Sequence, residues 1–198
     1  MNSIQPEPQA PIEPPVLPHE GPARIAPLKP SEFDNRHVEA LGPLVNRLTL
    51  PNVFATFVKS PLLFRKFSPF ANYILNRSTL SPRQREMVVI RAGYKNGCAY
   101  ELSKHLPAGR RAGLSEHELE SLVGPEYNDG GLWQSEDAAL ITAVDELMSS
   151  HTISDTTWAA LESEFSEDQI IDVLFTAGAY TMVSWALNAF RVQLDAET

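Results

Sequence analysis

Three residues with reactive side chains follow one another at helical spacing: Cys98, Glu101 and His105. On a helix that turns by about 100° per residue, separations of three and four residues place these side chains on one face. A thiol, a carboxylate and an imidazole could therefore line one wall of a site. The imidazole titrates near neutral pH and can accept or donate a proton, and the carboxylate could orient it or act as a base itself.

Cys98 stands in the first turn of this predicted helix, where free backbone N–H groups and a partial positive charge favour a thiolate. The three residues also have a purely structural interpretation. A cysteine is often buried as a small hydrophobic residue, and a glutamate four residues before a histidine is often a solvated pair. One cysteine and one histidine on a single helix lack the closed ligand set of a zinc site, so we expect neither a metal nor a cofactor.

The elements that would position these side chains are all predicted to be helices. Ser81-Pro82-Arg83-Gln84 begins a helix with a capping box, and Asn96-Gly97 ends it. The helix after Cys98 passes through His105 and is expected to bend or end at Pro107 and Gly109. Further helices are predicted over 31–48, 53–58, 61–75, 135–148, 154–164 and 167–194, with capping boxes at Ser115 with Glu118 and at Ser166 with Gln169, and a loop over 125–131. No strand pattern is found, so the predicted fold class is all-α, a helical bundle.

Composition and charge limit the domain organisation and the partners. The 198 residues suit one domain: a helical domain over 31–198 preceded by an arm over 1–30 that holds nine prolines. The arm is predicted to be mobile or to lie on the surface as a strap, and a proline-docking ligand is the less favoured alternative. A net charge of -9 argues against binding to nucleic acid or to an anionic membrane.

The longest apolar stretch, Val173 to Phe190, is interrupted by polar residues and is predicted to be a buried core helix rather than a membrane span. The N-terminus has no basic region followed by an apolar run, so no secretory signal is predicted. The lone Cys98 fits a reducing compartment. We therefore expect a cytoplasmic protein with a small-molecule substrate.

Several of these residues together resemble the carboxymuconolactone decarboxylase and alkylhydroperoxidase-D (AhpD-like) superfamily. The matching stretches are Leu80 to Arg91 with Glu86, Asn96 to Glu101 followed by His105, and Ala112-Gly113-Leu114-Ser115. The resemblance implies an AhpD-like helical bundle with a catalytic site at Glu86, Cys98, Glu101 and His105. It also implies a homo-oligomer, a trimer or hexamer, for which the phenylalanine-rich segment 53–70 offers apolar surface.

The resemblance has one departure that bears on the chemistry. In the alkylhydroperoxidase-D branch two cysteines precede the histidine, the second of them attacks peroxide, and Glu101 stands at that second position here. Resolving a sulfenic acid needs a partner thiol, and the chain has no second cysteine. We therefore expect acid/base chemistry by Glu101 and His105 on a small oxidised or carboxylated organic molecule: decarboxylation, isomerisation or a related proton transfer. Glu86 would tune the site, and Cys98 would be auxiliary.

Two other functions stay open: a one-cysteine thiol peroxidase that uses Cys98 as its nucleophile, and a non-catalytic helical oligomer. The candidate substrate-binding residues are Tyr100, Arg91 and Trp185. An arginine could clamp a substrate carboxylate, or it could pair with an acidic neighbour. Tyr100 is expected to point nearly opposite to the face that carries Glu101 and could equally belong to the core. Gly109 also departs from the family, which usually has alanine there.

Overall fold

Helices and 3-10 turns make up all the regular structure in residues 16, 18–125 and 131–196, the part of the chain that the computed structural model describes. The all-α prediction is therefore confirmed. In chain order the elements are η1 (Pro30–Glu32), α1 (Asn35–Leu41), η2 (Gly42–Asn46), α2 (Asn52–Phe57), α3 (Pro61–Asn76), α4 (Pro82–Lys95), α5 (Ala99–Arg111), α6 (Glu116–Leu122), α7 (Ser135–Ser150), α8 (Asp155–Glu164) and α9 (Glu167–Phe190).

The predicted helix starts form caps in the structure. The hydroxyl of Ser81 accepts from the backbone N–H of Gln84, whose side chain accepts in turn from the N–H of Ser81. The same reciprocal pairs form at the starts of α6 and α9, as predicted for both capping boxes. Each pair satisfies backbone N–H groups that have no partner within the helix, so these starts are determined by local sequence.

Two predicted helix boundaries are wrong. The helix expected over 31–48 is divided, because Gly42 adopts a positive φ of 53° and separates α1 from the 3-10 turn η2. The last helix ends at Phe190 rather than near Leu194, because Arg191 adopts the left-handed conformation with a φ of 53°.

The helix does not end after His105, since α5 continues through Pro107 and Gly109 to Arg111. Pro107 lies on the exposed side of the helix, where water can satisfy the carbonyl that loses its N–H partner. Gly109 lies on the buried side. A Cβ added there would come within 2.9 Å of Ile90 and 3.0 Å of Leu119. Glycine therefore allows α5 to pack closely on α4 and α6.

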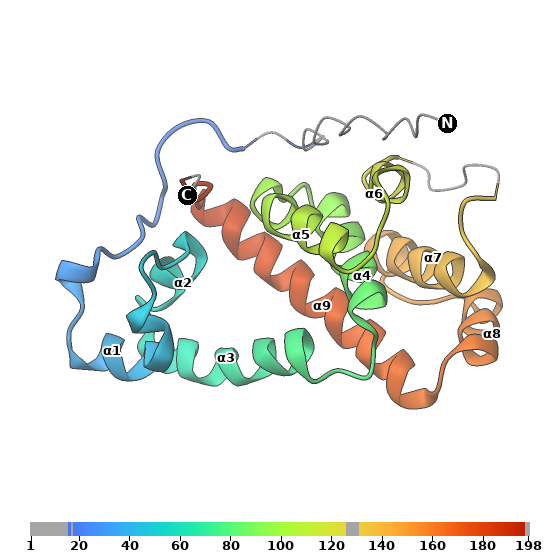
Figure 1. The fold of residues 1–198 in the computed structure, drawn as a ribbon, viewed down its shortest axis with the longest axis horizontal. Helices are drawn as coiled ribbons and strands as arrows, with labels where there is room; N and C mark the ends of the chain where they lie inside the picture. Colours follow the sequence, from blue (N-terminus) through green and yellow to red (C-terminus); the bar gives the residue numbers. More distant parts are fainter. Residues whose placement is uncertain (1–15, 17, 126–130, 197–198) are drawn as a thin grey trace, which may run out of the picture.

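Helix α9 crosses the centre of the molecule and contacts α3, α4, α5, α7 and α8 (Figure 1). Its length and composition would allow it to cross a membrane, but 44% of its most apolar window is buried inside the bundle. Its buried residues join those of α4 and α7 in the largest apolar cluster. This arrangement confirms the prediction of a core helix, and it places α9 next to α5, which carries Glu101 and His105.

The described part of the proline-rich arm, residues 18–30, lies against the helices. The backbone N–H of Arg24 donates to the carbonyl of Phe190 at 2.8 Å, and that of Leu28 donates to Ala55 at 3.0 Å. These bonds tie this part of the arm to the ends of α9 and α2. Residues 1–15 and 17 of the predicted arm, and residues 126–130 of the predicted loop, lie outside the described residues.

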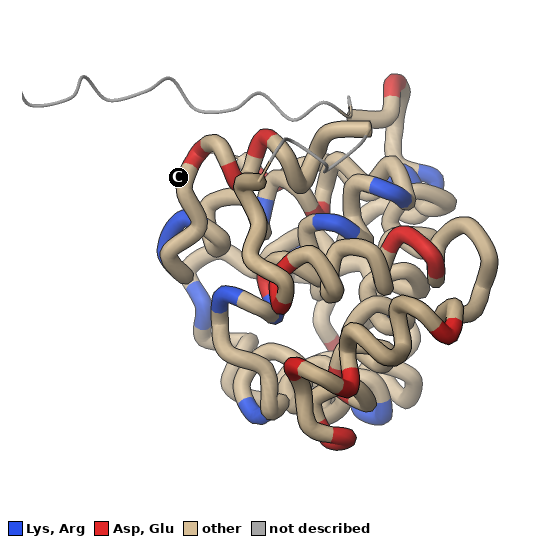
Figure 2. Tube along the Cα trace, turned by 90° about the vertical axis from the view of Figure 1, so that its right-hand side faces the viewer, with Lys and Arg blue, Asp and Glu red and all other residues tan. Residues whose placement is uncertain are grey.

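Charged residues are spread over the molecule rather than gathered in one place. In Figure 2 the acidic and basic positions are interspersed along the trace. Some of them form ion pairs at the surface, as Arg65 does with Glu39 at 2.9 Å.

Candidate active site

Two packed helices bring the predicted catalytic carboxylates to the same region. Glu86 lies on α4, within a stretch that is buried from Glu86 to Gly93. The chain then turns at Gly97, which has a φ of 59°, and continues into α5. A Cβ added at Gly93 would lie only 3.3 Å from the Cβ of Glu101. The small residue therefore lets α4 and α5 approach closely at the position of Glu101.

His105 lies between the two carboxylates. Its Nδ1 atom is 2.7 Å from Oε2 of Glu86, and its Nε2 atom is 3.3 Å from Oε2 of Glu101. The side chains are 12%, 4% and 7% exposed for His105, Glu86 and Glu101, so all three groups are largely removed from water. Three of the four predicted catalytic residues are therefore in direct contact, across two helices.

The environment favours the charged forms of His105 and Glu86. Burial by itself would lower the pKa of His105, but interactions with Glu101 and Glu86 outweigh burial and raise that pKa to about 9. Burial opposes ionisation of Glu86 as well, and His105 and Arg85 outweigh it, so the pKa of Glu86 is lowered. At neutral pH the site therefore holds His105 as an imidazolium in contact with the ionised carboxylate of Glu86.

The three groups face one another rather than a common point. Each carboxylate contacts a different nitrogen of the His105 ring. Within residues 16, 18–125 and 131–196, no cluster of histidine, cysteine, aspartate and glutamate has an arrangement that could hold a metal ion. The polar atoms of the site are thus arranged for sharing protons.

A cavity of about 220 Å³ adjoins Glu101 and His105. It lies between α5 on one side and α2, α3 and α9 on the other. Most of its wall is apolar, from residues that include Val53, Phe54, Phe57, Phe67, Ile74, Leu75 and Val183. Glu86 is not among the lining residues and lies behind His105. A ligand in the cavity would therefore meet the carboxylate of Glu101 and the ring of His105.

Tyr180 of α9 is a further residue of this cavity that sequence reasoning missed. Its ring lies edge-on to the ring of His105, with centroids 5.0 Å apart, and the residue is 8% exposed. A sequence signal was available, because Thr176, Tyr180 and Ser184 recur every four residues in the mainly apolar stretch 173–190. The structure buries all three. Polar residues in such a row share one face, and here that face is turned inward.

Cys98 does not join the other three residues. Its side chain is fully buried in an apolar cluster with Leu187 and Val192, and it is not among the residues that line the cavity. Burial raises the pKa of the thiol to about 11, despite the backbone N–H of Glu101 that acts in the opposite direction. The expectation of a thiolate at the start of the helix is therefore wrong, because desolvation outweighs the favourable backbone groups.

Tyr100 lines the same cavity as Glu101, although the helical spacing placed it on the opposite side of α5. The cavity extends from α9 to α2 and so meets more than one face of that helix. The Tyr100 hydroxyl accepts from the N–H of Val53 at 3.2 Å and donates to Asp195 at 3.0 Å. It thus contributes a wall of the cavity and a tie to the C-terminal segment, with its hydroxyl already engaged.

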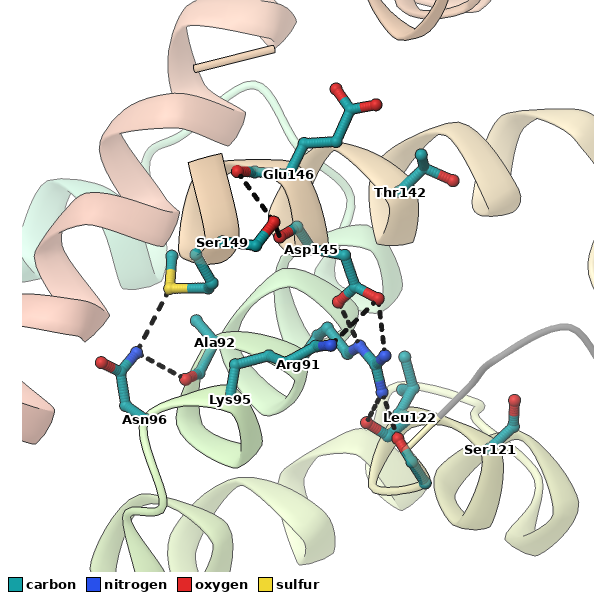
Figure 3. Close-up of polar contacts among 12 residues, drawn as sticks. Arg91, Ala92, Lys95, Asn96, Ser121, Leu122, Thr142, Asp145, Glu146 and Ser149 are labelled. Atoms are coloured by element: carbon teal, nitrogen blue, oxygen red, sulfur yellow. Dashed lines mark hydrogen bonds and ion pairs between the residues drawn. The ribbon is translucent and has the colours of Figure 1, made fainter. Parts of the chain in front are cut away.

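The other two predicted substrate-binding residues lie away from the cavity. The Arg91 side chain is fully buried and forms a two-point ion pair with Asp145 at 2.6 and 2.7 Å. It also donates to the carbonyls of Leu122 and Gly124 (Figure 3). Trp185 is 65% exposed on the outer face of α9. Arg91 therefore joins α4 to α7 and to the end of α6, and pairs with an acidic neighbour as the structural alternative predicted.

Comparison with known proteins places these features in a family context. Residues 61–145, which include Glu86, Glu101 and His105, match the model of the carboxymuconolactone decarboxylase family. No curated protein sequence matches the chain significantly. Tyr180 lies outside the matched segment.

Solved structures share the fold. A protein of unknown function from Agrobacterium tumefaciens is 24% identical, with a TM-score of 0.65 over 71% of this chain and 97% of that chain. A peroxidase-related protein from Silicibacter sp. TM1040 is 20% identical, with a TM-score of 0.70 over 90% and 94%. The debrominase Bmp8 is 17% identical, with a TM-score of 0.71 over 87% and 92%.

Proposed function

Since residues 61–145 match the model of the carboxymuconolactone decarboxylase family and the helical fold is shared with AhpD-like proteins, we propose that the protein is an enzyme that catalyses proton transfer at carbon on a small organic molecule. The observation that carries this proposal is the buried contact of His105 with Glu86 and Glu101 beside an apolar cavity. Isomerisation and decarboxylation both belong to this class of reaction.

Glu101 is the group proposed to exchange the proton with the substrate, because it lines the cavity and its carboxylate contacts the ring of His105. In an isomerisation it takes the proton from a carbon next to a carbonyl group. The electron pair of the broken C–H bond moves toward the carbonyl oxygen and forms an enolate. The protonated Glu101 then returns a proton to a different carbon, which restores the carboxylate.

In a decarboxylation the same residues act in a different order. The bond between carbon and the substrate carboxylate breaks, carbon dioxide leaves, and the electron pair remains as an enolate. Glu101 takes a proton from water, passes it to the carbon of the enolate, and returns to the carboxylate, while the hydroxide left from water is taken up by carbon dioxide as bicarbonate. Both reactions use the carboxylate as the only group that exchanges a proton with carbon.

His105 and Glu86 are proposed to act on Glu101 rather than on the substrate carbon. The Nε2–H of the imidazolium lies 3.3 Å from the Glu101 carboxylate and can hold it in position. Glu86, at 2.7 Å from Nδ1, keeps the imidazole charged and fixes its orientation. A neutral His105 would interact more weakly with the Glu101 carboxylate. The contact between His105 and Glu86 therefore helps to hold Glu101 in position as the base.

The structure bears on the two alternative functions. A one-cysteine peroxidase needs a thiolate that peroxide can reach, whereas Cys98 is fully buried and its pKa is raised. A non-catalytic oligomer would need no space for a ligand beside His105, whereas a cavity of about 220 Å³ adjoins that ring. Both observations favour the proton-transfer proposal.

The test of this proposal is hydrogen exchange at carbon. Cyclohexanone in D2O is incubated with the purified protein, and the loss of the signal from the hydrogens next to its carbonyl is followed by proton NMR. We expect exchange above the buffer rate, lowered by roughly 10²–10⁴-fold in Glu101→Gln. Equal rates with wild-type protein and with Glu101→Gln would refute the role of Glu101.

We further propose that the protein assembles with copies of itself through the outer face of α9. The exposed residues Ile171, Phe175, Met182 and Trp185 lie on that face and are 48–65% exposed. All four are uncharged. Contact between copies through this face would remove these four apolar side chains from water. In the segment 53–70, by contrast, several phenylalanines line the cavity instead.

A further inference from the structure

We propose that Tyr180 is a further catalytic residue, whose hydroxyl donates a hydrogen bond to the oxygen of a neutral carbonyl compound bound in the cavity. This inference rests on the proposed proton transfer and names its substrate class. It extends the site to α9, beyond the segment that matches the family model.

The hydroxyl of Tyr180 is available for a ligand. Among the described residues it forms no hydrogen bond, although the residue is 8% exposed and lines the cavity. Tyr100, the other tyrosine of the cavity, has both Val53 and Asp195 as hydroxyl partners. A hydroxyl at the wall of a mostly apolar cavity loses free energy unless a ligand or water supplies a hydrogen-bond partner. Tyr180 is thus the tyrosine of this site whose hydrogen bond is left for a ligand.

The surroundings keep this hydroxyl a neutral donor. Burial, and then the negative charges of Glu101 and Glu86, raise the pKa of Tyr180 well above its ordinary value. A neutral donor can hydrogen-bond to an acceptor oxygen and can stabilise the negative charge that develops there. Proton removal by Glu101 would develop that charge on the carbonyl oxygen, which is the atom that a fixed donor stabilises in the transition state.

The charges in the cavity favour a neutral substrate. Lys104 is the only lysine or arginine that lines it, and its Nζ atom is 2.6 Å from Asp195. Arg85 lies 3.3 Å from Glu86. Arg85 does not line the cavity, and the His105 imidazolium that does is already shared by Glu86 and Glu101. A substrate carboxylate would therefore meet Glu101 with no cation in the cavity wall that lacks an acidic partner. Repulsion of this kind disfavours an anion by much more than it disfavours an uncharged ketone.

The size and polarity of the cavity further define the class of substrate that it could bind. At about 220 Å³ it suits a compact molecule, and aromatic and aliphatic side chains form most of its wall. An apolar ring with one carbonyl group would fill this space and place one acceptor oxygen toward Tyr180. Isomerisation of such a ketone then fits the site better than decarboxylation of an anion.

The test compares cyclohexanone with methylenecyclohexane, a molecule of similar shape in which a CH2 group replaces the carbonyl oxygen. Binding to each is measured by ligand-observed NMR with wild-type protein and with Tyr180→Phe, which keeps the ring against His105. We expect wild-type protein to prefer the ketone by about three- to tenfold and Tyr180→Phe to lose that preference. The carbonyl carbon signal of labelled cyclohexanone should shift on binding to wild-type protein and shift less with the variant.

Tyr73→Phe is the matched control, since the Tyr73 hydroxyl donates to Asp172 at 2.9 Å and the residue does not line the cavity. It should retain the preference for the ketone. No binding of cyclohexanone by wild-type protein, or an unchanged preference in Tyr180→Phe, would overturn the inference. Exchange of the ketone hydrogens tests the proposed proton transfer, and the binding preference for the ketone tests the role of Tyr180. The two can fail independently, because the protein could prefer the ketone through Tyr180 without catalysing exchange. Where exchange does occur, Tyr180→Phe should slow it by roughly 10²-fold.

Discussion

The Nδ1 atom of His105 lies 2.7 Å from a carboxylate oxygen of Glu86, and 19 residues of the chain separate the two. Both side chains are buried, so the pair is shielded from solvent and from salt. Without a charged partner, a buried imidazole would lose its proton below neutral pH. The contacts with Glu101 and Glu86 together therefore keep His105 in its charged state.

Because of this pair, the free energy of unfolding should decrease as the pH becomes alkaline. The pKa of His105 is raised from 6.5 to about 9 in the folded state. Its contribution to stability is therefore fully present below pH 6.5 and is lost as the pH rises through about 9. We expect the free energy of unfolding, measured by urea titration, to fall over that range by an amount on the order of 3 kcal/mol.

The matched variant for this measurement is His105→Gln. It cannot change its charge, so the difference between the two proteins isolates the histidine from other groups that titrate at high pH. The variant should be less stable at pH 6 and should lose less stability toward pH 10. If both proteins lost stability in parallel, His105 would not be held charged in the folded state.

The site residues should differ in their effect on exchange of the cyclohexanone hydrogens. His105→Gln removes the positive charge beside Glu101 and should abolish measurable exchange, as removal of the Glu101 carboxylate does. Cys98→Ala should stay within about threefold of wild type, because the thiol does not line the cavity. Initial rates in D2O, measured on variants with matching circular dichroism, check this order. A Cys98→Ala protein without exchange would show that the thiol takes part.

The thiol of Cys98 should be inert in the folded protein. It is fully buried, and its pKa is raised to about 11, so the thiolate that reacts with oxidants and alkylating agents is scarce at neutral pH. We expect little sulfenic acid by mass spectrometry after exposure to hydrogen peroxide, and rapid labelling by iodoacetamide only in urea. Rapid oxidation of the native protein that depends on His105 would instead support the one-cysteine peroxidase.

Arg91 should matter for stability and not for ligand binding. Arg91→Met removes both contacts with Asp145 and leaves that carboxylate with Lys95, at 3.3 Å, as its remaining cation. We expect the free energy of unfolding to fall by about 3 kcal/mol or more, with the affinity of the folded variant for cyclohexanone unchanged. Arg65→Met, which breaks an exposed pair, should cost less than about 1 kcal/mol. Loss of ketone binding by folded Arg91→Met would instead support the prediction that Arg91 binds the substrate.

Assembly should depend on the outer face of α9. Phe175 is 57% exposed there, and Phe175→Glu would place a charge in the proposed contact between copies. Light scattering at micromolar concentration should show an oligomer, a trimer or hexamer, for wild-type protein and a smaller species for this variant. Leu48→Glu is the control, because Leu48 is fully exposed outside this face. A wild-type protein that is monomeric under these conditions would contradict the proposal.

Local sequence determined where most helices begin and which residues of α5 share a face. A capping box such as Ser81 with Gln84 needs only a separation of three residues, and Glu101 meets His105 because a helix brings positions four apart together. The family motif added Glu86 to the same site. These features could be predicted because the groups involved are close in the chain or belong to a recognisable pattern.

Only the tertiary structure decided which groups face the cavity. The spacing of Cys98 matched that of its neighbours, yet packing by residues from the end of α9 buries the thiol and raises its pKa. The sequence allowed Arg91 to bind a substrate carboxylate or to pair with an acidic residue. In the structure its guanidinium pairs with Asp145, which lies 54 positions away in the chain. Tyr180 enters the site from α9, 75 residues after His105. Burial, pKa and cavity shape depend on side chains that arrive from distant helices, and spacing along one helix does not contain that information.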